Sequence, residues 1–412
     1  MSCGRGRHVT VTGQVQFLHY SRARAVPSVG YMTTTLDSFT DLAARIGAVA
    51  EEHAAEHDRD ATFVTEAYDA MREHGYLALA VPAELGGLGA SMRQVCHAQA
   101  ELARHDGATA LSVAMHLYLT LMQAYRYRKG APDAAAVLRR VADEGIVIAT
   151  SGGSDWLWPT TRAVPTDDGF LVTGRKVFCS QSPAATVVAT CAVLGEPGDD
   201  AQVLHFSVPF AAPGVRIEEN WDTLGMRGTA SHDVVMEDVF VPADKIAARR
   251  PYGELGAPLL AATVHFAPVG GATYHGIAAG ARDRAVASLG GNRGPMPLTA
   301  LPRVHRQVGL MDAKLRTSWW SLMGALDDLG DDYVADANAL ATVMLAKRQA
   351  VVSAIEVVDL AMDVMGGRSF FRRSGMERAY RDVRAGTFHP LTPEATLTYA
   401  GKVALGDPGV AE

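Results

Sequence analysis

The stretch WDTLGMRGTASHDVVMEDVFVP, residues 221–242, decides how the chain divides into domains. Its second half is rich in valine, which favours strands, whereas its first half is rich in glycine and threonine and reads as a turn. Other short β-rich runs between residues 146 and 246, such as GFLVTGRKVF and QVLHFSVPF, are separated by Gly, Pro and Asp. This spacing is typical of a small barrel, so we expect a central β-barrel domain over residues 146–247.

The segments on either side of the β region have helical periodicity. FTDLAARIGAVAEEHAAEH and TFVTEAYDAMREHGYLAL carry apolar residues three and four positions apart. The same periodicity returns after Pro258 and persists to about Arg373, and GGNRGPMPLTALP interrupts it as an expected loop between two long helices. We therefore expect an N-terminal helical domain over residues 32–145 and a C-terminal helical bundle over residues 248–412.

Composition excludes several classes of partner. The chain has 412 residues, 48% of them hydrophobic, and a formal net charge of -7, so it lacks the broad positive field of a nucleic-acid-binding protein. No run of 18 apolar residues favours a membrane span. The four cysteines are far apart and form no CxxC pair, which argues against a zinc site or a disulfide framework and favours a cytoplasmic location.

Residues 1–31 contain four arginines, no acidic residue and no sustained apolar segment. This composition is not that of a secretory signal. We interpret the segment as a disordered tail, with an upstream translation start or a transit peptide as the alternatives.

Four stretches in register resemble the acyl-CoA dehydrogenase superfamily. They are LAVPAELGGLG (79–89), ATSGGSD (149–155), the stretch 221–242 and MGGRSFFRRSGMERAYRD (365–382). The resemblance implies an α+β multidomain fold with an N-terminal helical domain, a central β-barrel and a C-terminal four-helix bundle. It also implies a homodimer or homotetramer, with FAD held between the β-domain and the C-terminal helices.

Two departures from the family pattern leave FMN or an exchangeable reduced flavin as alternatives to FAD. Arg293 is not followed by the usual Phe, and Asp363 stands where Gln is frequent. An anionic side chain at that place would repel a pyrophosphate unless it faces away.

The resemblance assigns cofactor-binding residues. Phe178 matches the aromatic residue that lies against the isoalloxazine ring, and Ser180 matches the hydroxyl residue that reaches flavin N5, where hydrogen bonding tunes the ring. Cys179 between them is expected to face the core, because strand residues alternate. Thr150 and Ser151 match the loop that contacts the flavin, although this loop is about two residues shorter than usual.

Three further glycine and serine positions follow from the same resemblance. Ser154 matches the loop position near the phosphate end of the substrate. Gly366 and Gly367 allow the main chain to approach the cofactor pyrophosphate, since glycine lacks a Cβ. Their alternative role is to end a helix.

The expected catalytic base is missing. In the resembling dehydrogenases a Glu eight residues after the Asp of an Arg-Asp pair removes the α-proton, and counting from Asp382 that position holds Pro390. His389 precedes it, which resembles the flavin monooxygenases of the superfamily, in which a His helps to bind or deprotonate the substrate. His116 is a second candidate catalytic group and His265 a candidate substrate contact; the alternative for each is a buried core histidine.

These observations leave three hypotheses. The first is a flavin-dependent oxidoreductase without the usual Glu, which acts on an acyl thioester or related small molecule and has an electron-transfer partner. The second is a two-component monooxygenase that receives reduced flavin from a separate reductase and uses O2. The third is an inactive flavin-binding or scaffold homologue, because fold alone does not determine the reaction.

Overall fold

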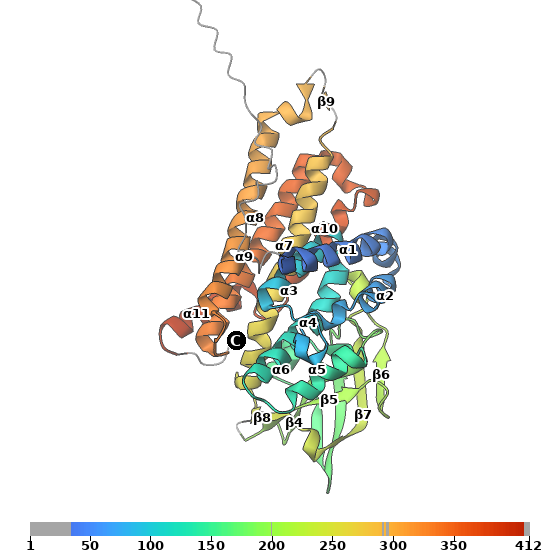
Figure 1. The fold of residues 1–412 in the computed structure, drawn as a ribbon, viewed down its shortest axis with the longest axis vertical. Helices are drawn as coiled ribbons and strands as arrows, with labels where there is room; N and C mark the ends of the chain where they lie inside the picture. Colours follow the sequence, from blue (N-terminus) through green and yellow to red (C-terminus); the bar gives the residue numbers. More distant parts are fainter. Residues whose placement is uncertain (1–33, 199, 291, 294–295, 408–412) are drawn as a thin grey trace, which may run out of the picture.

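The computed structural model describes residues 34–198, 200–290, 292–293 and 296–407. The prediction of a disordered tail over residues 1–31 lies outside these ranges. A sheet forms one end of the molecule, three long helices extend from it to the other end, and shorter N-terminal helices lie against both (Figure 1). The expected order of helical, β and helical segments is confirmed.

The N-terminal part is helical and its helix starts are capped. Ser91 and Gln94 form a capping box at the start of α3, and the Asp106 side chain accepts a hydrogen bond from Thr109 N at the start of α4. Helix α4 is buried on nearly all sides, so it forms the centre of this part. The elements are α1 (Thr34–Asp60), α2 (Thr65–Glu73), η1 (Tyr76–Ala78), η2 (Ala83–Leu85), α3 (Met92–His105), α4 (Gly107–Arg128) and α5 (Ala134–Asp143).

The middle of the chain forms an eight-stranded sheet with the order β6-β7-β3-β2-β4-β5-β8, in which β1 pairs with β4. Its strands enclose a hydrophobic core that includes Val172, Phe206 and Met236, and β4, β5 and β7 are buried over most of their length. Within the described residues the end strands β6 and β8 do not pair with each other, so the hydrogen-bonded sheet is open at these two edges. The elements are β1 (Ile148–Thr150), α6 (Gly153–Leu157), β2 (Arg162–Pro165), β3 (Gly169–Lys176), β4 (Val187–Leu194), β5 (Gln202–Pro209), β6 (Val215–Glu218), η3 (Arg227–Thr229), β7 (Asp233–Pro242), η4 (Ala243–Lys245) and β8 (Ala248–Pro251).

The C-terminal part consists of long helices and a short irregular segment. Helices α7, α8 and α9 pack on one another, and α11 packs on α9. The predicted loop over GGNRGPMPLTALP connects α7 to α8 and carries the short strands β9 and β10. The elements are α7 (Ala257–Ala287), β9 (Asn292–Arg293), β10 (Met296–Pro297), η5 (Leu298–Ala300), α8 (Pro302–Leu329), α9 (Ala337–Met365), η6 (Gly366–Phe370), η7 (Arg372–Ser374), α10 (Met376–Val383), η8 (Arg384–Thr387) and α11 (Pro393–Ala404).

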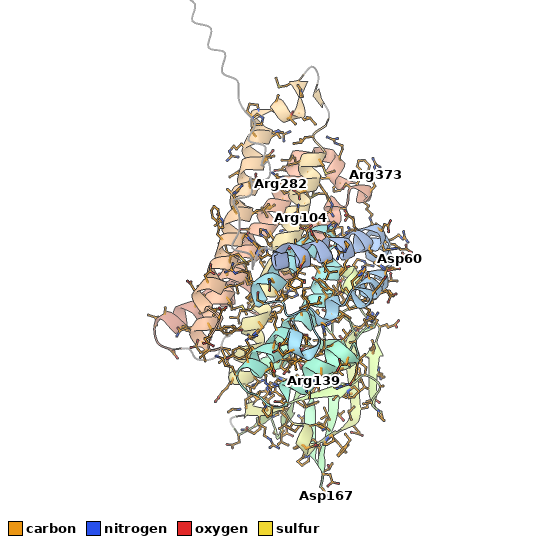
Figure 2. All side chains as sticks on the ribbon, in the orientation of Figure 1. Asp60, Arg104, Arg139, Asp167, Arg282 and Arg373 are labelled. Carbon is orange, nitrogen blue, oxygen red and sulfur yellow. The ribbon has the colours of Figure 1, made fainter. Side chains whose placement is uncertain are left out.

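One hydrophobic core joins the two helical parts. It includes Leu117 of α4, Ile277 of α7 and Val357 of α9, all of them buried. At the surface of this contact Arg104 of α3 and Arg282 of α7 both reach the Asp283 carboxylate (Figure 2). The N-terminal helices and the C-terminal bundle therefore form a single packed unit, against which the sheet is placed.

Candidate functional site

Three segments that are far apart in the sequence meet between the sheet and the C-terminal helices. Gly152 N, in the loop after β1, donates a hydrogen bond to Val177 O, just past β3, at 2.8 Å. A Cβ on Gly152 would lie 3.0 Å from Phe178 Cδ2, and a Cβ on Gly153 would overlap Pro390. Glycine is needed at position 153 for this close approach, and the shortened loop links the predicted flavin residues to the segment that carries His389.

Phe178 and Ser180 lie at the end of strand β3. The Phe178 ring is 58% exposed and packs edge-on against Trp221, with ring centroids 5.9 Å apart. Ser180 Oγ lies 2.8 Å from Ser231 Oγ, which lies 2.6 Å from Thr229 Oγ1. The hydroxyl of Ser180 is thus held in a chain of hydroxyl groups, whereas the aromatic surface of Phe178 is open to a ligand.

Cys179, between these two residues, is fully buried as expected, although it lies beyond the end of β3 and Ser180 is buried as well, so strand alternation is not the cause. Burial raises the pKa of its thiol to about 12. The thiol is therefore protonated and unreactive at neutral pH.

The backbone around this strand end is strained. Four residues other than glycine adopt positive φ angles here: Phe178 (57°), Gln181 (59°), Met226 (55°) and Ala230 (42°). Each such residue costs on the order of 1–3 kcal/mol, and such residues concentrate at functional sites. Four of the six positive-φ residues other than glycine in the described chain belong to this one cluster.

Gln181, which the sequence did not suggest, holds the strained segment in place. Its Oε1 accepts a hydrogen bond from Tyr68 Oη at 2.5 Å, and its Nε2 donates to Ile148 O at 3.0 Å. Its main-chain N donates to Thr229 O at 2.9 Å. Gln181 thereby ties the strand end to both α2 and β1.

The loop before α6 is anchored by a buried ion pair. Lys176 Nζ donates to Asp155 Oδ2 at 2.8 Å, and Ser151 Oγ donates to the same oxygen at 2.9 Å. Thr150 Oγ1 accepts a hydrogen bond from Trp156 Nε1 at 3.1 Å. The side chains of Thr150 and Ser151 are thus engaged within the protein, so their flavin contacts, which stay a prediction, would come from the main chain. Ser154 lies in α6, but its side chain is outside the described residues.

His389 lies in a cluster formed by two long helices. Its Nδ1 is 2.9 Å from Tyr274 Oη of α7, and its ring lies edge-on to Phe266 with centroids 6.0 Å apart. Lys347 of α9 donates to the main-chain oxygens of His389, Pro390 and Leu391 at 2.9, 3.1 and 2.9 Å. Tyr274 and Lys347 were missed by sequence reasoning.

The electrostatics of this cluster favour neutral groups. Burial, reinforced by the Lys347 charge, lowers the pKa of His389 to about 3, and burial lowers the pKa of Lys347 to about 7. Burial raises the pKa of the Tyr274 hydroxyl well above its usual value. At neutral pH His389 is therefore an uncharged imidazole beside an uncharged phenol.

The structure favours the core alternative for His116. Its Nε2 donates to Leu77 O at 2.7 Å and its Nδ1 accepts from Ile148 N at 3.1 Å, so both ring nitrogens are engaged by the main chain. Burial lowers its pKa to about 4. We correct the catalytic assignment: His116 joins α4 to β1 and η1, and no ring nitrogen remains for chemistry.

The same reasoning corrects His265. Its Nδ1 donates to Ala261 O at 2.6 Å and its Nε2 is 2.6 Å from Tyr333 Oη. The side chain is buried, and burial lowers its pKa to about 4. We therefore no longer treat His265 as a substrate contact.

The glycine pair after α9 has the features of a helix end. Gly366 is the C-cap residue with φ 65°, a conformation that glycine adopts most readily. A Cβ on Gly366 or Gly367 would meet no described atom within 4 Å. These features favour the helix-end alternative, and contact with the cofactor pyrophosphate stays a prediction.

The carboxylates that flank the expected base position along the chain are those of Asp382 and Glu394. Asp382 is buried and accepts a hydrogen bond from Met226 N at 2.5 Å, and burial raises its pKa to about 7. The next acidic residue along the chain is Glu394, which is exposed in the first turn of α11. Pro390, which lies between Asp382 and Glu394 in the sequence, packs against Gly153. Pro390 occupies the position at which the family resemblance places the base, and its neighbour is the His389 imidazole; the absence of the usual Glu from the site stays a prediction.

Comparison with known proteins agrees with this arrangement. Three family models match consecutive parts of the chain: the N-terminal domain of acyl-CoA dehydrogenase over residues 37–131, its middle domain over 149–239 and its C-terminal domain over 269–394. The chain belongs to the acyl-CoA dehydrogenase family. The fold class inferred from the sequence is thereby confirmed, while the bounds 32–145, 146–247 and 248–412 stay predictions.

Relatives within the acyl-CoA dehydrogenase family include different kinds of enzyme. The chain is 32% identical to the putative acyl-CoA dehydrogenase YdbM of Bacillus subtilis, over 86% of this chain and 93% of that protein. It is also 32% identical to the amino sugar nitrososynthase DnmZ of Streptomyces peucetius, over 89% and 92%. The solved structure of KijD3 in complex with FMN and a dTDP-linked 3-amino-4-keto sugar superposes with a TM-score of 0.80 at 29% identity, over 92% of this chain and 95% of that one. The protein is therefore a flavin-dependent oxidoreductase of this family.

The residues present fit a flavin. An exposed aromatic ring, Phe178, stands beside the loop glycine Gly152, and the hydroxyl of Ser180 lies two residues further along. The exposed Phe388 adds a second apolar surface on the segment that carries His389. None of the described helices is long and apolar enough to cross a bilayer.

Proposed function

We propose that the protein is the oxygenase component of a two-component flavin-dependent monooxygenase. The observation that carries this proposal is the pairing of Pro390, at the place of the dehydrogenase base, with a neutral His389 whose Nδ1 contacts Tyr274. Abstraction of an α-proton needs a suitably placed base. Oxygen insertion into a polar group of the substrate needs no such carboxylate.

The proposed substrate is a primary amine carried by a sugar or a similar small molecule. Support comes from the similarity to DnmZ and to KijD3, whose bound sugar carries a 3-amino group. Reduced flavin, when bound, supplies two electrons to O2, so that one oxygen atom goes to the substrate nitrogen and the other leaves as water. FMN or FAD would contact Phe178 and Ser180, and a separate reductase would supply its reduced form.

The chain's own groups would bind and orient the amine. Tyr274 Oη engages His389 Nδ1, so Nε2 would be the ring nitrogen that contacts the substrate amine. The low pKa of His389, about 3, keeps the ring uncharged throughout the neutral range. The exposed rings of Phe178 and Phe388 would exclude water from one side of the reacting nitrogen.

Acyl thioester dehydrogenation is the second candidate, favoured by the 32% identity to YdbM. One experiment separates the two functions. Flavin-loaded protein is mixed anaerobically with a panel of acyl-CoA thioesters, and separately the reduced protein is mixed with O2 and a panel of dTDP-linked amino sugars. We expect no bleaching by thioesters and oxygen-dependent formation of a hydroxylamine or nitroso product. Rapid bleaching by a thioester would overturn the monooxygenase proposal, and inactivity in both arms would favour a scaffold homologue.

We also propose that the protein is a homo-oligomer, a dimer or tetramer. Large apolar side chains are exposed on its long helices, among them Trp320 of α8 (65%) and Leu345 of α9 (41%). Exposed apolar residues of this size are enriched at interfaces. Light scattering coupled to size-exclusion chromatography would measure the mass, and a strictly monomeric protein would contradict the proposal.

A further inference from the structure

Lys347 makes an unusual set of contacts for a lysine. It lies on α9, is 1% exposed, and directs its ammonium group at three successive main-chain carbonyls, those of residues 389–391. As an ammonium group Lys347 has one N–H donor for each of these carbonyls, and as a neutral amine it keeps two donors for the same segment. The side chain therefore fixes the path of the main chain at the residue that carries the imidazole.

Tyr274 fixes the other end of the same residue. Its Oη lies 2.9 Å from His389 Nδ1, and Tyr274 is itself fully buried on α7. Phe266, two turns earlier on α7, packs against the imidazole edge. Within the described chain Nε2 makes no hydrogen bond, and it lies on the side of the ring away from Tyr274. The ring is thus held by α7 and the main chain by α9.

Burial of a lysine is costly. Removing an ammonium group from water costs several kcal/mol even when its hydrogen bonds are made, and an apolar side chain of similar length would fill the same space without that cost. A methionine could fill the same space but could not donate hydrogen bonds to the main-chain oxygens of residues 389–391. Placing this segment is therefore what the lysine does and a methionine could not.

We propose that Lys347 and Tyr274 are positioning residues for His389: Lys347 holds the main chain and Tyr274 holds Nδ1 of the ring, so that Nε2 is presented to the substrate. This inference rests on the proposed function, in which His389 contacts the substrate. It adds the two residues through which α7 and α9 set the geometry of that contact.

The first test uses Tyr274→Phe, which removes one oxygen atom. Tyr333→Phe is the matched control, because it removes the equivalent tyrosine-histidine hydrogen bond, to His265, elsewhere in the same bundle. The readout is the rate at which diethyl pyrocarbonate modifies His389 in the flavin-free protein, measured by mass spectrometry of the peptide. The reagent attacks an imidazole nitrogen that carries no proton, and the hydrogen bond to Tyr274 governs which nitrogen is protonated and exposed. We therefore expect Tyr274→Phe to change the rate at least threefold and Tyr333→Phe to leave it unchanged.

The second test uses Lys347→Met and the milder Lys347→Gln. Amide hydrogen exchange in the peptide over residues 386–393 should rise at least tenfold in Lys347→Met and less in Lys347→Gln, while FMN affinity stays within threefold of wild type. Lys314→Met, which removes a surface lysine paired with Glu356, should change neither quantity. If both Lys347 variants fail to fold, Lys347 is a general structural residue and its assignment is overturned.

Turnover separates this inference from the proposed function. We expect kcat to fall about tenfold in Tyr274→Phe with KM nearly constant, and more strongly in His389→Ala. The inference would be overturned, and the function left standing, if His389→Ala were inactive while Tyr274→Phe matched Tyr333→Phe in both modification rate and kcat. A fully active His389→Ala would overturn the role of His389 and, with it, the inference.

Discussion

The buried amine of Lys347 should make the stability of the protein depend on pH above neutrality. The pKa of Lys347 is lowered by burial from 10.5 to about 7. Between these two values the unfolded chain binds a proton at Lys347 that the folded chain does not, so the free energy of unfolding rises with pH. The perturbation that tests this is Lys347→Met, which removes the titrating group and keeps most of the side-chain volume.

The size of the effect follows from the two pKa values. The slope approaches about 1.4 kcal/mol per pH unit above the folded pKa and is about half of that at pH 7. Between pH 7 and pH 9 the wild-type protein should therefore gain about 2 kcal/mol relative to Lys347→Met. All other titrating groups are shared by the two proteins and cancel in this comparison.

The assay is urea unfolding of both proteins at pH 7 and pH 9, at one protein concentration, because subunit association also affects the midpoint. Lys314→Met serves as the control, since its amine lies at the surface beside Glu356 and should produce no such difference. The reasoning would fail if the unfolding free energies of wild type and Lys347→Met changed equally between pH 7 and pH 9, within about 0.5 kcal/mol. That result would show that the amine is not held away from water.

Five further predictions concern the site itself. Ser180→Ala should cost about 1 kcal/mol of stability or less but change the rate at which bound reduced flavin reacts with O2 in stopped-flow measurements; unchanged kinetics would remove Ser180 from the flavin. His389→Ala should lower product formation by about 10² to 10⁴, and Pro390→Glu should not create rapid flavin bleaching by acyl-CoA, which anaerobic spectra would reveal. The raised pKa of Asp382, about 7, means that the wild-type protein loses stability as pH rises from 5 to 8. Over this range Asp382→Asn should gain about 2–3 kcal/mol of unfolding free energy relative to wild type. Equal urea midpoints for the two proteins at both pH values would contradict this. Gly153→Ala should weaken FMN binding measured by fluorescence, because its Cβ overlaps Pro390, and an unchanged affinity would argue against the loop contact.

The sequence predicted the fold because helical periodicity and β-rich runs are properties of short stretches. The burial of Cys179 was also predicted, whereas the roles of Phe178 and Ser180 at the flavin stay predictions. The partners of His389 are different, since Tyr274 lies 115 positions and Lys347 42 positions away along the chain. Only the packing of α7, α9 and the 386–391 segment brings them together.

The roles of the three candidate histidines could not be distinguished from the sequence. His116, His265 and His389 all stand among apolar residues, and nothing in their surroundings along the chain says which ring nitrogens are engaged. The structure engages both nitrogens of His116 and of His265 but only Nδ1 of His389. Lys347 did leave a signal, because it occupies a position between Met344 and Val351 where the helical period of α9 calls for an apolar side chain.

The contact between Gly153 and Pro390 has a consequence for the order of events during protein synthesis. Ser180 and His389 are separated by 209 positions, which a ribosome adds in roughly 10 to 40 s at about 5–20 residues per second. Throughout that interval the nascent chain carries Gly153 and the strand end but not Pro390, which packs against Gly153. We therefore expect ribosome-bound chains halted before residue 389 to fold their sheet without retaining flavin.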